Sequence, residues 1–317
     1  MTPEVNFPEN LFPAIRERRS DYRDLVKSGL NRMQQSSAVI CGLARDVAEI
    51  LPVTITRLER IGQRFGDYRI VIYENDSRDD TRSLLVHWAD RNPRVHAITE
   101  QIGDPVNVPA RCLQRAARMA NYRNRCLDVL RSEYPHFDYA LVVDTDLQGG
   151  WSDDGLANTF GHDGWDFVGS NGIIFKRLGR ELNVPIQYDA WAFRVDEAFS
   201  ALPTRQVNEM TWPPGGPLIP VTSCFGGLGV YRMDAILSAR YAGWDSEHIP
   251  LHCEMRRNGF QRMFLNPSQI ALYGRRHRLS DCWMIPLLTG ITRLQNLSRP
   301  QAMTTLRAEP LCLGMRS

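Results

Sequence analysis

The feature that most constrains how this chain folds is a short apolar segment that ends in two acidic residues. Residues 139–143 are Tyr-Ala-Leu-Val-Val, and Asp144-Thr145-Asp146 follow them directly. A run this short and this rich in Val and Leu predicts a buried strand rather than a helix. Side chains two positions apart on a strand point to the same side, so we expect Asp144 and Asp146 to project together where the strand ends.

Two carboxylates held side by side repel each other unless a cation lies between them. Hard oxygen ligands suit Mg²⁺ or Mn²⁺, which are usually shared with substrate phosphates. In open α/β sheets the ligand site lies at the carboxyl ends of the strands, which is where Asp144 and Asp146 are expected. The pair therefore predicts a Mn²⁺ or Mg²⁺ site, and the alternative is an ordinary turn or helix cap.

Alternation of apolar strands with helical patterns predicts an α/β fold with a mostly parallel sheet. Strands are expected over 38–43, 68–73 and 95–98, and a helix over 112–131 leads into the strand before Asp144. Between them, helical spacing from Val47 to Ile61 is broken or restarted at Pro52. The proline-rich segment 212–217 is expected to be a loop.

The chain divides into three predicted parts. Apolar residues at helical spacing between 12 and 35 indicate an N-terminal helical arm over 1–35, packed on the main domain or touching a membrane surface. A single main domain is expected over 36–290, followed by a polar tail over 291–317.

Composition excludes several classes of protein. The 317 residues carry 38 basic and 36 acidic side chains, a net charge of +2, which argues against a nucleic-acid partner recognised by bulk charge. Seven scattered cysteines without a C-x-x-C pair predict neither a disulfide framework nor a zinc ribbon. With no signal peptide and no apolar run of membrane-spanning length, we expect a cytoplasmic protein, with peripheral contact at the inner membrane face left open.

A polar turn follows the second expected strand, over residues 73–81. Glu74 and Asp76 in this turn are candidates to accept hydrogen bonds from a nucleotide base or ribose, as acids do at this edge of doubly wound folds. The alternative is a capping turn, with Asn75, Asp76 or Ser77 as the helix N-cap. Arg45 follows the first expected strand, and it is the candidate cationic side chain for binding a nucleotide at this edge of the sheet.

Arg123 shares the helical spacing of the apolar residues in the helix over 112–131. A guanidinium on the inner face of a helix requires an anion, because burying it unpaired is costly. The anion is either a structural carboxylate, such as Asp144 itself, or the diphosphate of a substrate, which arginine binds with two parallel hydrogen bonds.

Histidines and acids gather late in the chain. His248 and His252 have the spacing of two metal ligands on one helix face, but Pro250 between them makes a regular helix doubtful, so a zinc site is disfavoured. Glu247 is the better candidate, as an acid/base group. His277 lies in a basic cluster and is either a metal or diphosphate ligand or surface charge.

The order of these motifs resembles the GT-A glycosyltransferases, in which an acidic turn contacts the nucleoside and a D-x-D motif binds the metal and diphosphate. More specifically, the chain resembles the capsule-associated cryptococcal mannosyltransferase family, glycosyltransferase family 69. The likeness covers roughly residues 37–275 and is carried by residues 73–81, Tyr188-Asp189-Ala190-Trp191-Ala192-Phe193-Arg194, Ser223-Cys224-Phe225-Gly226-Gly227, Ser246-Glu247-His248 and Asn266-Pro267. The chain has Cys-Phe-Gly-Gly where that family is expected to have Cys-Trp-Asn-Gly, and it lacks the membrane anchor typical of fungal members.

The resemblance implies sugar transfer from a nucleoside-diphosphate sugar, GDP-mannose in this family, to a glycan or glycolipid acceptor with retention of configuration. It implies Mn²⁺ or Mg²⁺ at Asp146 and Asp144, with Glu74 and Asp76 at the nucleoside. Asp189 and Glu247 are the candidates for the group near the anomeric carbon or the acceptor hydroxyl. Two other functions stay open: a nucleotidyltransferase that makes sugar nucleotides, and a non-catalytic nucleotide-sugar binding or scaffold protein.

Overall fold

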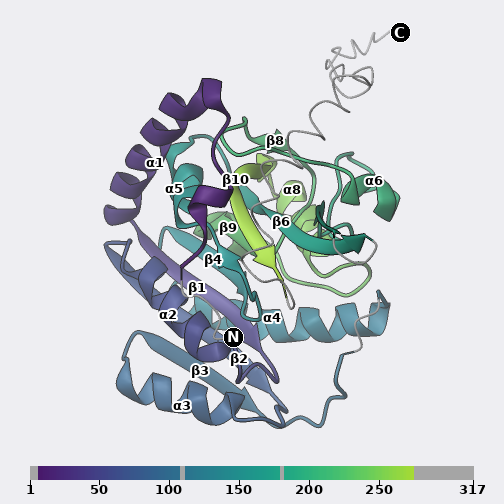
Figure 1. Cartoon of the computed structure of the whole chain (residues 1–317). Coiled ribbons are helices and arrows are strands. Elements are labelled where there is room, and N and C mark those ends of the chain that lie inside the picture. The colour runs from purple at the N-terminus through teal and green to yellow at the C-terminus, as the bar shows by residue number, and fades with distance from the viewer. Residues whose placement is uncertain (1–5, 108–110, 179–181, 275–317) are drawn as a thin grey trace, which may run out of the picture.

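A computed structural model describes residues 6–107, 111–178 and 182–274. Its centre is a sheet with the strand order β3-β2-β1-β4-β9-β6-β10-β5, in which β7 also pairs with β6 and β8 with β10 (Figure 1). The strands are β1 Ser37–Ala44, β2 Asp67–Asn75, β3 Val95–Glu100, β4 Tyr139–Asp144, β5 Gly150–Trp151, β6 Phe167–Leu178, β7 Leu182–Gln187, β8 Ile219–Pro220, β9 Leu228–Arg232 and β10 Met263–Tyr273.

Most of the long strands run in one direction. β3, β2, β1 and β4 are parallel to one another, β9 runs against both β4 and β6, and β10 is parallel to β6. The expected α/β class, with a mixed and mostly parallel sheet flanked by helices, is confirmed. All four strands expected in the first half are present and extend one or two residues beyond most of the predicted ends.

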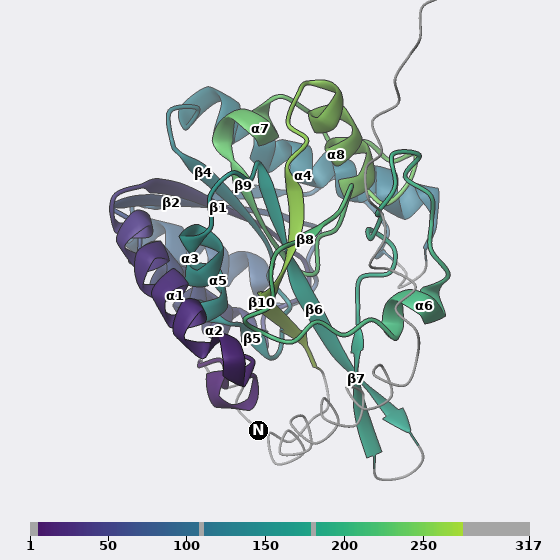
Figure 2. The same ribbon diagram turned by 90° about the horizontal axis from the view of Figure 1, so that it is seen from above.

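Helices cover both faces of the sheet (Figure 2). The alternation of side chains along the strands divides the core accordingly, with Val39 and Val142 in one hydrophobic cluster and Ile40 and Val143 in the other. The helices are η1 Glu9–Leu11, η2 Arg16–Arg18, α1 Arg19–Gln34, α2 Leu51–Gly62, α3 Thr81–Arg91, α4 Leu113–Glu133, α5 Asp153–Gly161, α6 Thr204–Asn208, α7 Met233–Leu237 and α8 His248–Arg257.

The N-terminal arm is a helix only from Arg19, later than the helical spacing indicated, because residues 12–15 form a loop before the η2 turn. α1 packs closely on α5, where glycines allow the approach of the two backbones. A Cβ added at Gly29 would lie 1.7 Å from the carbonyl oxygen of Ala157, and one at Gly161 would lie 2.2 Å from that of Leu25. The arm is therefore part of the folded body.

Two segments that contain proline have the structures predicted for them. Pro52 lies in the first turn of α2, which begins at Leu51, so the helical pattern restarts there as expected. Residues 212–217 form the expected loop.

Along the described ranges, no helix has the length and apolar character needed to cross a membrane.

Candidate functional site

The D-x-D motif lies at the carboxyl end of β4, but its two acids occupy different structures. The strand ends at Asp144, and Thr145 and Asp146 form a turn. Strand alternation therefore does not extend to Asp146, and the joint projection of the two carboxylates stays a prediction. Asp146 is exposed, whereas the side chain of Asp144 is only 25% exposed.

Both carboxylate oxygens of Asp144 accept hydrogen bonds from elements far away in the sequence. Nη2 of Arg123, on α4, donates to Oδ1 across 3.1 Å. The hydroxyl of Tyr273, the last residue of β10, donates to Oδ2 across 2.6 Å. The orientation of Asp144 is thus fixed by two charged or polar donors on opposite sides.

Arg123 is buried, as its helical spacing predicted, and links two acids. Its Nε donates to Oε1 of Glu247 across 3.0 Å, in addition to the bond with Asp144. Burial alone would lower the pKa of Arg123, but the charges of Glu247 and Asp144 raise it above its usual value. The ring of Phe225 lies 5.0 Å from the guanidinium carbon, which adds a cation–π contact. Arg123 therefore stays charged and holds both carboxylates in place.

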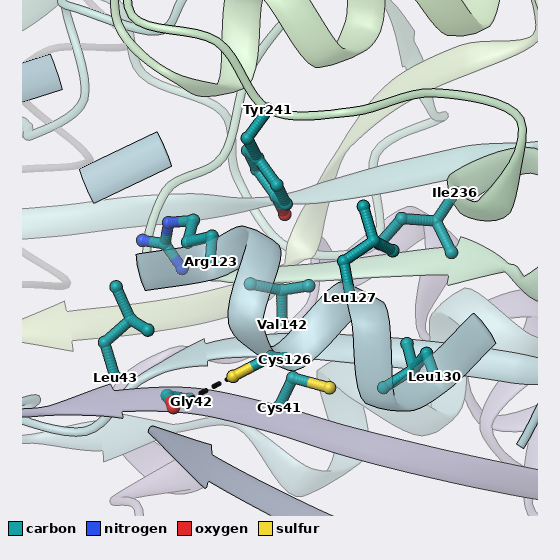
Figure 3. A pocket seen from close by; sticks show the side chains of 10 residues that line it. All are labelled: Cys41, Gly42, Leu43, Arg123, Cys126, Leu127, Leu130, Val142, Ile236 and Tyr241. Carbon is teal, nitrogen blue, oxygen red and sulfur yellow. Dashed lines mark hydrogen bonds between the residues drawn. The ribbon is translucent and has the colours of Figure 1, made fainter. Parts of the chain in front are cut away.

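The inner side of Arg123 faces an apolar gap between α4 and the sheet (Figure 3). This gap has a volume of about 10 Å³, at the lower limit for one water molecule. Cys126 closes it from α4, where its Sγ lies 3.7 Å from the carbonyl oxygen of Gly42. A dry inner wall strengthens the ion pairs of Arg123, because the local dielectric constant is low.

Glu247 is positioned by the start of α8. The helix runs from His248 to Arg257 and contains both histidines, so the expected interruption at Pro250 is wrong. Pro250 lies in the first turn, where its missing N–H has no helical partner to lose.

The two histidines of α8 are both buried, but among the described residues only His252 has hydrogen-bond partners for its ring nitrogens. Ser223 and Tyr231 lie 2.8 and 3.1 Å from the ring nitrogens Nδ1 and Nε2 of His252, so both nitrogens are engaged. Burial lowers the pKa of His252 to about 3, with Arg256 adding to the effect, so the ring is neutral at physiological pH. His248 stacks on Phe225 with ring centroids 3.9 Å apart.

Asp189 follows β7 and reaches the same region. Its oxygens accept hydrogen bonds from the backbone N–H groups of Ala192, at 3.2 Å, and Gly226, at 2.9 Å. Burial raises the pKa of Asp189 despite these bonds, and the nearby charges of Asp144 and Glu247 raise it further. The carboxylates of three separate chain segments therefore share one electrostatic environment.

Two tyrosines cover this group of acids, and neither was recognised as a site residue from the sequence. The rings of Tyr188 and Tyr273 stack with centroids 3.8 Å apart. The pKa of Tyr188 is raised by burial and then by Asp144, Asp189 and Asp146. Since all three charges act on one phenol, Asp146 lies close enough to contribute to the same site.

The turn before β9 explains the glycine pair in the Cys-Phe-Gly-Gly segment. Gly226 and Gly227 have φ angles of 68° and 95°, a region that disfavours other residues. A Cβ on Gly227 would also lie 2.6 Å from the Tyr273 hydroxyl, and the Gly227 carbonyl accepts a hydrogen bond from the N–H of Asp144 at 2.9 Å. The pair lets the backbone pass directly beside Asp144.

The other predicted residues form a second group at the ends of β1, β2 and β3. Asp76, with φ 54°, accepts backbone hydrogen bonds from Ile102, Gly103 and Asp104 at 2.9–3.0 Å. Burial alone would raise the pKa of Asp76, but these bonds and one from the Asn75 amide lower it. Asp76 therefore holds the loop after β3 as a carboxylate.

Glu74 and Arg45 flank this loop. Glu74 is buried, with Oε1 accepting from the N–H of Ser77 at 2.9 Å and Oε2 lacking a hydrogen-bond partner within the described ranges. Arg45 donates to the carbonyl oxygens of Asp104 and Pro105 at 2.7 and 3.2 Å. The expected N-caps are wrong, because α3 begins at Thr81 after Asp80.

The chemistry of Asp144 and Asp146 fits a divalent metal that substrate phosphates share. Around the site, the described residues include no group of three or more metal-binding side chains. Mg²⁺-type sites that bind substrate phosphates use one or two carboxylates, and here Asp146 is the exposed one. His277, the third predicted ligand, lies outside the described residues.

No family model matches the chain, and no curated protein matches it. Among solved structures it is similar to the mannosyltransferase PcManGT from Pyrobaculum calidifontis in complex with GDP-Man and Mn²⁺, at 12% identity and TM-score 0.45, over 88% of this chain and 68% of that one. It is also similar to GalNAc-T7 with UDP, GalNAc and Mn²⁺, at 8% identity and TM-score 0.47, over 87% of this chain and 56% of that one.

A third similar structure is glucosyl-3-phosphoglycerate synthase from Mycobacterium tuberculosis with Mn²⁺, UDP and phosphoglyceric acid. The identity is 12% and the TM-score 0.43, over 87% of this chain and 84% of that one. At these identities and TM-scores the likeness assigns neither a family nor an activity to this chain.

Proposed function

We propose that this protein is a metal-dependent glycosyltransferase that uses a nucleoside-diphosphate sugar. The observation that carries the proposal is the double ion pair of Arg123 with Asp144 and Glu247 beneath the carboxyl end of β4. One buried cation holds acids from two distant segments at the edge where α/β sheets bind ligands. Asp189 and the exposed Asp146 add negative charge that a bound cation would balance.

Asp144 and Asp146 are the proposed holders of Mn²⁺ or Mg²⁺, and His277 is the proposed further ligand. When bound, the ion would stabilise the negative charge that develops on the departing diphosphate. Arg123 and the Tyr273 hydroxyl each hold one oxygen of Asp144 and so fix the orientation of this carboxylate.

The nucleoside would lie over the ends of β1 and β2. Glu74 offers an oxygen without a hydrogen-bond partner, which suits an N–H or O–H donor of a base or ribose. Asp76 and Arg45 are proposed to act there through the loop they hold, which contains Asp104. This is a narrower role for Asp76 than direct contact with the nucleoside.

Asp189 is the better candidate for the group near the anomeric carbon, and Glu247 the second. Glu247 is paired with Arg123, whereas Asp189 accepts hydrogen bonds from two backbone N–H groups of the described residues and has a raised pKa. The resemblance in sequence supports mannose transfer from GDP-mannose with retention of configuration, to a glycan or glycolipid. We propose a cytoplasmic protein, with peripheral contact at the inner membrane face.

The proposal is tested by thermal unfolding with GDP, UDP and their sugars, in Mn²⁺ and in EDTA. A ligand at a hundred times its Kd should stabilise the fold by about 2.7 kcal/mol, and only when the metal is present. Donor turnover with an acceptor panel is measured in parallel. Binding without turnover favours a scaffold protein, and release of pyrophosphate from a nucleoside triphosphate and a sugar phosphate favours a nucleotidyltransferase.

A further inference from the structure

We propose that a surface groove beside α8 binds an acidic carbohydrate. The groove has a volume of about 460 Å³, within the range of small-ligand sites. Trp244 and Phe199 contribute its aromatic part, and its polar part consists of Glu197, Arg256, Arg257 and Gln261. It is separate from the acids around Asp144, none of which lines it.

Of the two aromatic side chains, Trp244 is exposed and Phe199 is half-buried. Trp244 is 57% exposed, although a large apolar ring normally gains free energy from burial. Phe199 is held at φ 55°, a rare conformation for a bulky residue, and its carbonyl oxygen accepts a hydrogen bond from Nε of Arg194 at 2.8 Å. Exposed aromatic faces suit the apolar C–H face of a sugar ring.

The charges of the groove select the kind of sugar. Arg256 pairs with Glu197 and also donates to the carbonyl oxygen of Gln261 at 2.9 Å, so it is fixed in place. Arg257 is exposed, with no ion-pair partner within the described part of the chain. The lining has more cationic than anionic groups, so a carboxylate or phosphate on the sugar would complete it.

The groove adjoins the proposed active site through a short stretch of chain. Trp244 precedes Glu247 by three residues, so their Cα atoms are at most about 11 Å apart. Asp245 between them pairs with Arg194 at 3.0 Å, which anchors this stretch. An acidic glycan that reaches from Trp244 along this stretch to Glu247 would serve as the acceptor. The acceptor role rests on the proposed function, but binding of the glycan does not.

The test measures calorimetric binding of a galacturonate hexamer to the full chain in EDTA without nucleotide. We expect saturable binding that weakens about 10-fold or more in Trp244→Ala and in Arg257→Gln, since each loses a direct contact of the sugar. Arg91→Gln is the matched control, because Arg91 is exposed in the last turn of α3 as Arg257 is in that of α8. This control should bind as the wild type does.

Three results with the carbohydrates would overturn the proposal: no saturable binding of the galacturonate hexamer, binding by both groove variants as tight as that of the wild type, or equally tight binding of a mannose hexamer. Equal binding of a glutamate hexamer would instead identify a surface for acidic peptides and also overturn it. Donor turnover without an acceptor should be unchanged in Trp244→Ala. If the wild type binds the glycan but turns over no donor, the glycan-binding role of the groove is supported. That result would contradict only the proposed glycosyltransferase activity.

Discussion

The hydroxyl of Tyr273 donates a 2.6 Å hydrogen bond to Oδ2 of Asp144. The two residues are 129 positions apart, at the ends of β10 and β4. The bond fixes the carboxylate from the side opposite Arg123, so it sets the direction in which Asp144 can offer its remaining lone pairs to a metal.

Tyr273→Phe should weaken the use of the metal without unfolding the protein. The variant keeps the ring that stacks on Tyr188 and loses only the hydroxyl. We expect Mn²⁺-dependent donor turnover to fall about 10–100-fold, the usual cost of removing a group that orients a metal-binding carboxylate. The measurement is a Mn²⁺ titration of turnover. Tyr188→Phe is the matched control, and equal effects of both variants would contradict the special role of the Tyr273 hydroxyl.

Arg123→Ala should destabilise the fold as well as reduce activity. The side chain is 5% exposed and holds Asp144 and Glu247, whose side chains are 25% and 8% exposed. Removing one member of such a buried group typically costs about 3–5 kcal/mol of unfolding free energy. Urea denaturation measures the loss. Arg125→Ala on the same helix is the control, because its 3.6 Å pair with Glu100 lies at the surface and should contribute about 0–1 kcal/mol.

Local periodicity made the first half of the fold predictable. Short apolar runs fixed β1 to β4, and helical spacing placed Arg123 on the inner face of α4, where the structure has it. Each of these sequence patterns lies within a single strand or helix. The turn at Asp146 escaped prediction because a strand end depends on the neighbouring strands, and the pairing of β4 with β1 ends at Asp144 and that with β9 at Val143.

The second half depends on contacts that no local pattern encodes. β9 runs against β4 and β6 and brings the Gly226–Gly227 turn beside Asp144, while β10 brings Tyr273. The sequence motifs Tyr188–Arg194 and Ser223–Gly227 carry the resemblance to known glycosyltransferases. Their structural connection is seen only in the fold, where the N–H of Gly226 donates a hydrogen bond to Asp189. Which acids meet is decided by tertiary packing.

Glu9 should make the stability of the fold depend on pH. Burial raises its pKa to about 7, although hydrogen bonds from the Ser152 hydroxyl and the Asp154 N–H act in the opposite direction. The native state therefore holds this proton more tightly than the unfolded chain, whose carboxyl titrates near 4.5. Stability should fall as pH rises from about 4.5 to about 7 and level off above.

Glu9→Gln should remove this dependence. At pH 8 the variant should be more stable than the wild type by on the order of 2 kcal/mol, a value reduced for the partial exposure of the side chain. Urea unfolding at pH 5, 6, 7 and 8 measures the difference. Glu17→Gln, at an exposed position of the same N-terminal segment, should run parallel to the wild type. If the unfolding free energy of Glu9→Gln changed with pH in the same way as that of the wild type, Glu9 would titrate as a carboxyl in water does and the prediction would be wrong.

Asp146→Asn separates an enzyme from a binding protein. The residue is exposed in the turn after β4, so the substitution should leave the fold intact, as circular dichroism would show. Asparagine keeps the size of the side chain but loses the charge that faces the proposed metal. If this carboxylate helps to hold the ion at the leaving diphosphate, donor turnover at fixed Mn²⁺ should fall by about 10²–10³.

The matched control for this variant is Asp90→Asn, an exposed charge on α3 away from the site, which should turn over donor as the wild type does. Thermal unfolding with GDP completes the test, because the added stability in Mn²⁺ should shrink in Asp146→Asn and persist in Asp90→Asn. Wild-type turnover in a folded Asp146→Asn protein would remove this carboxylate from the mechanism. In that case Asp144, with both oxygens already engaged by Arg123 and Tyr273, would be a structural acid rather than a metal ligand.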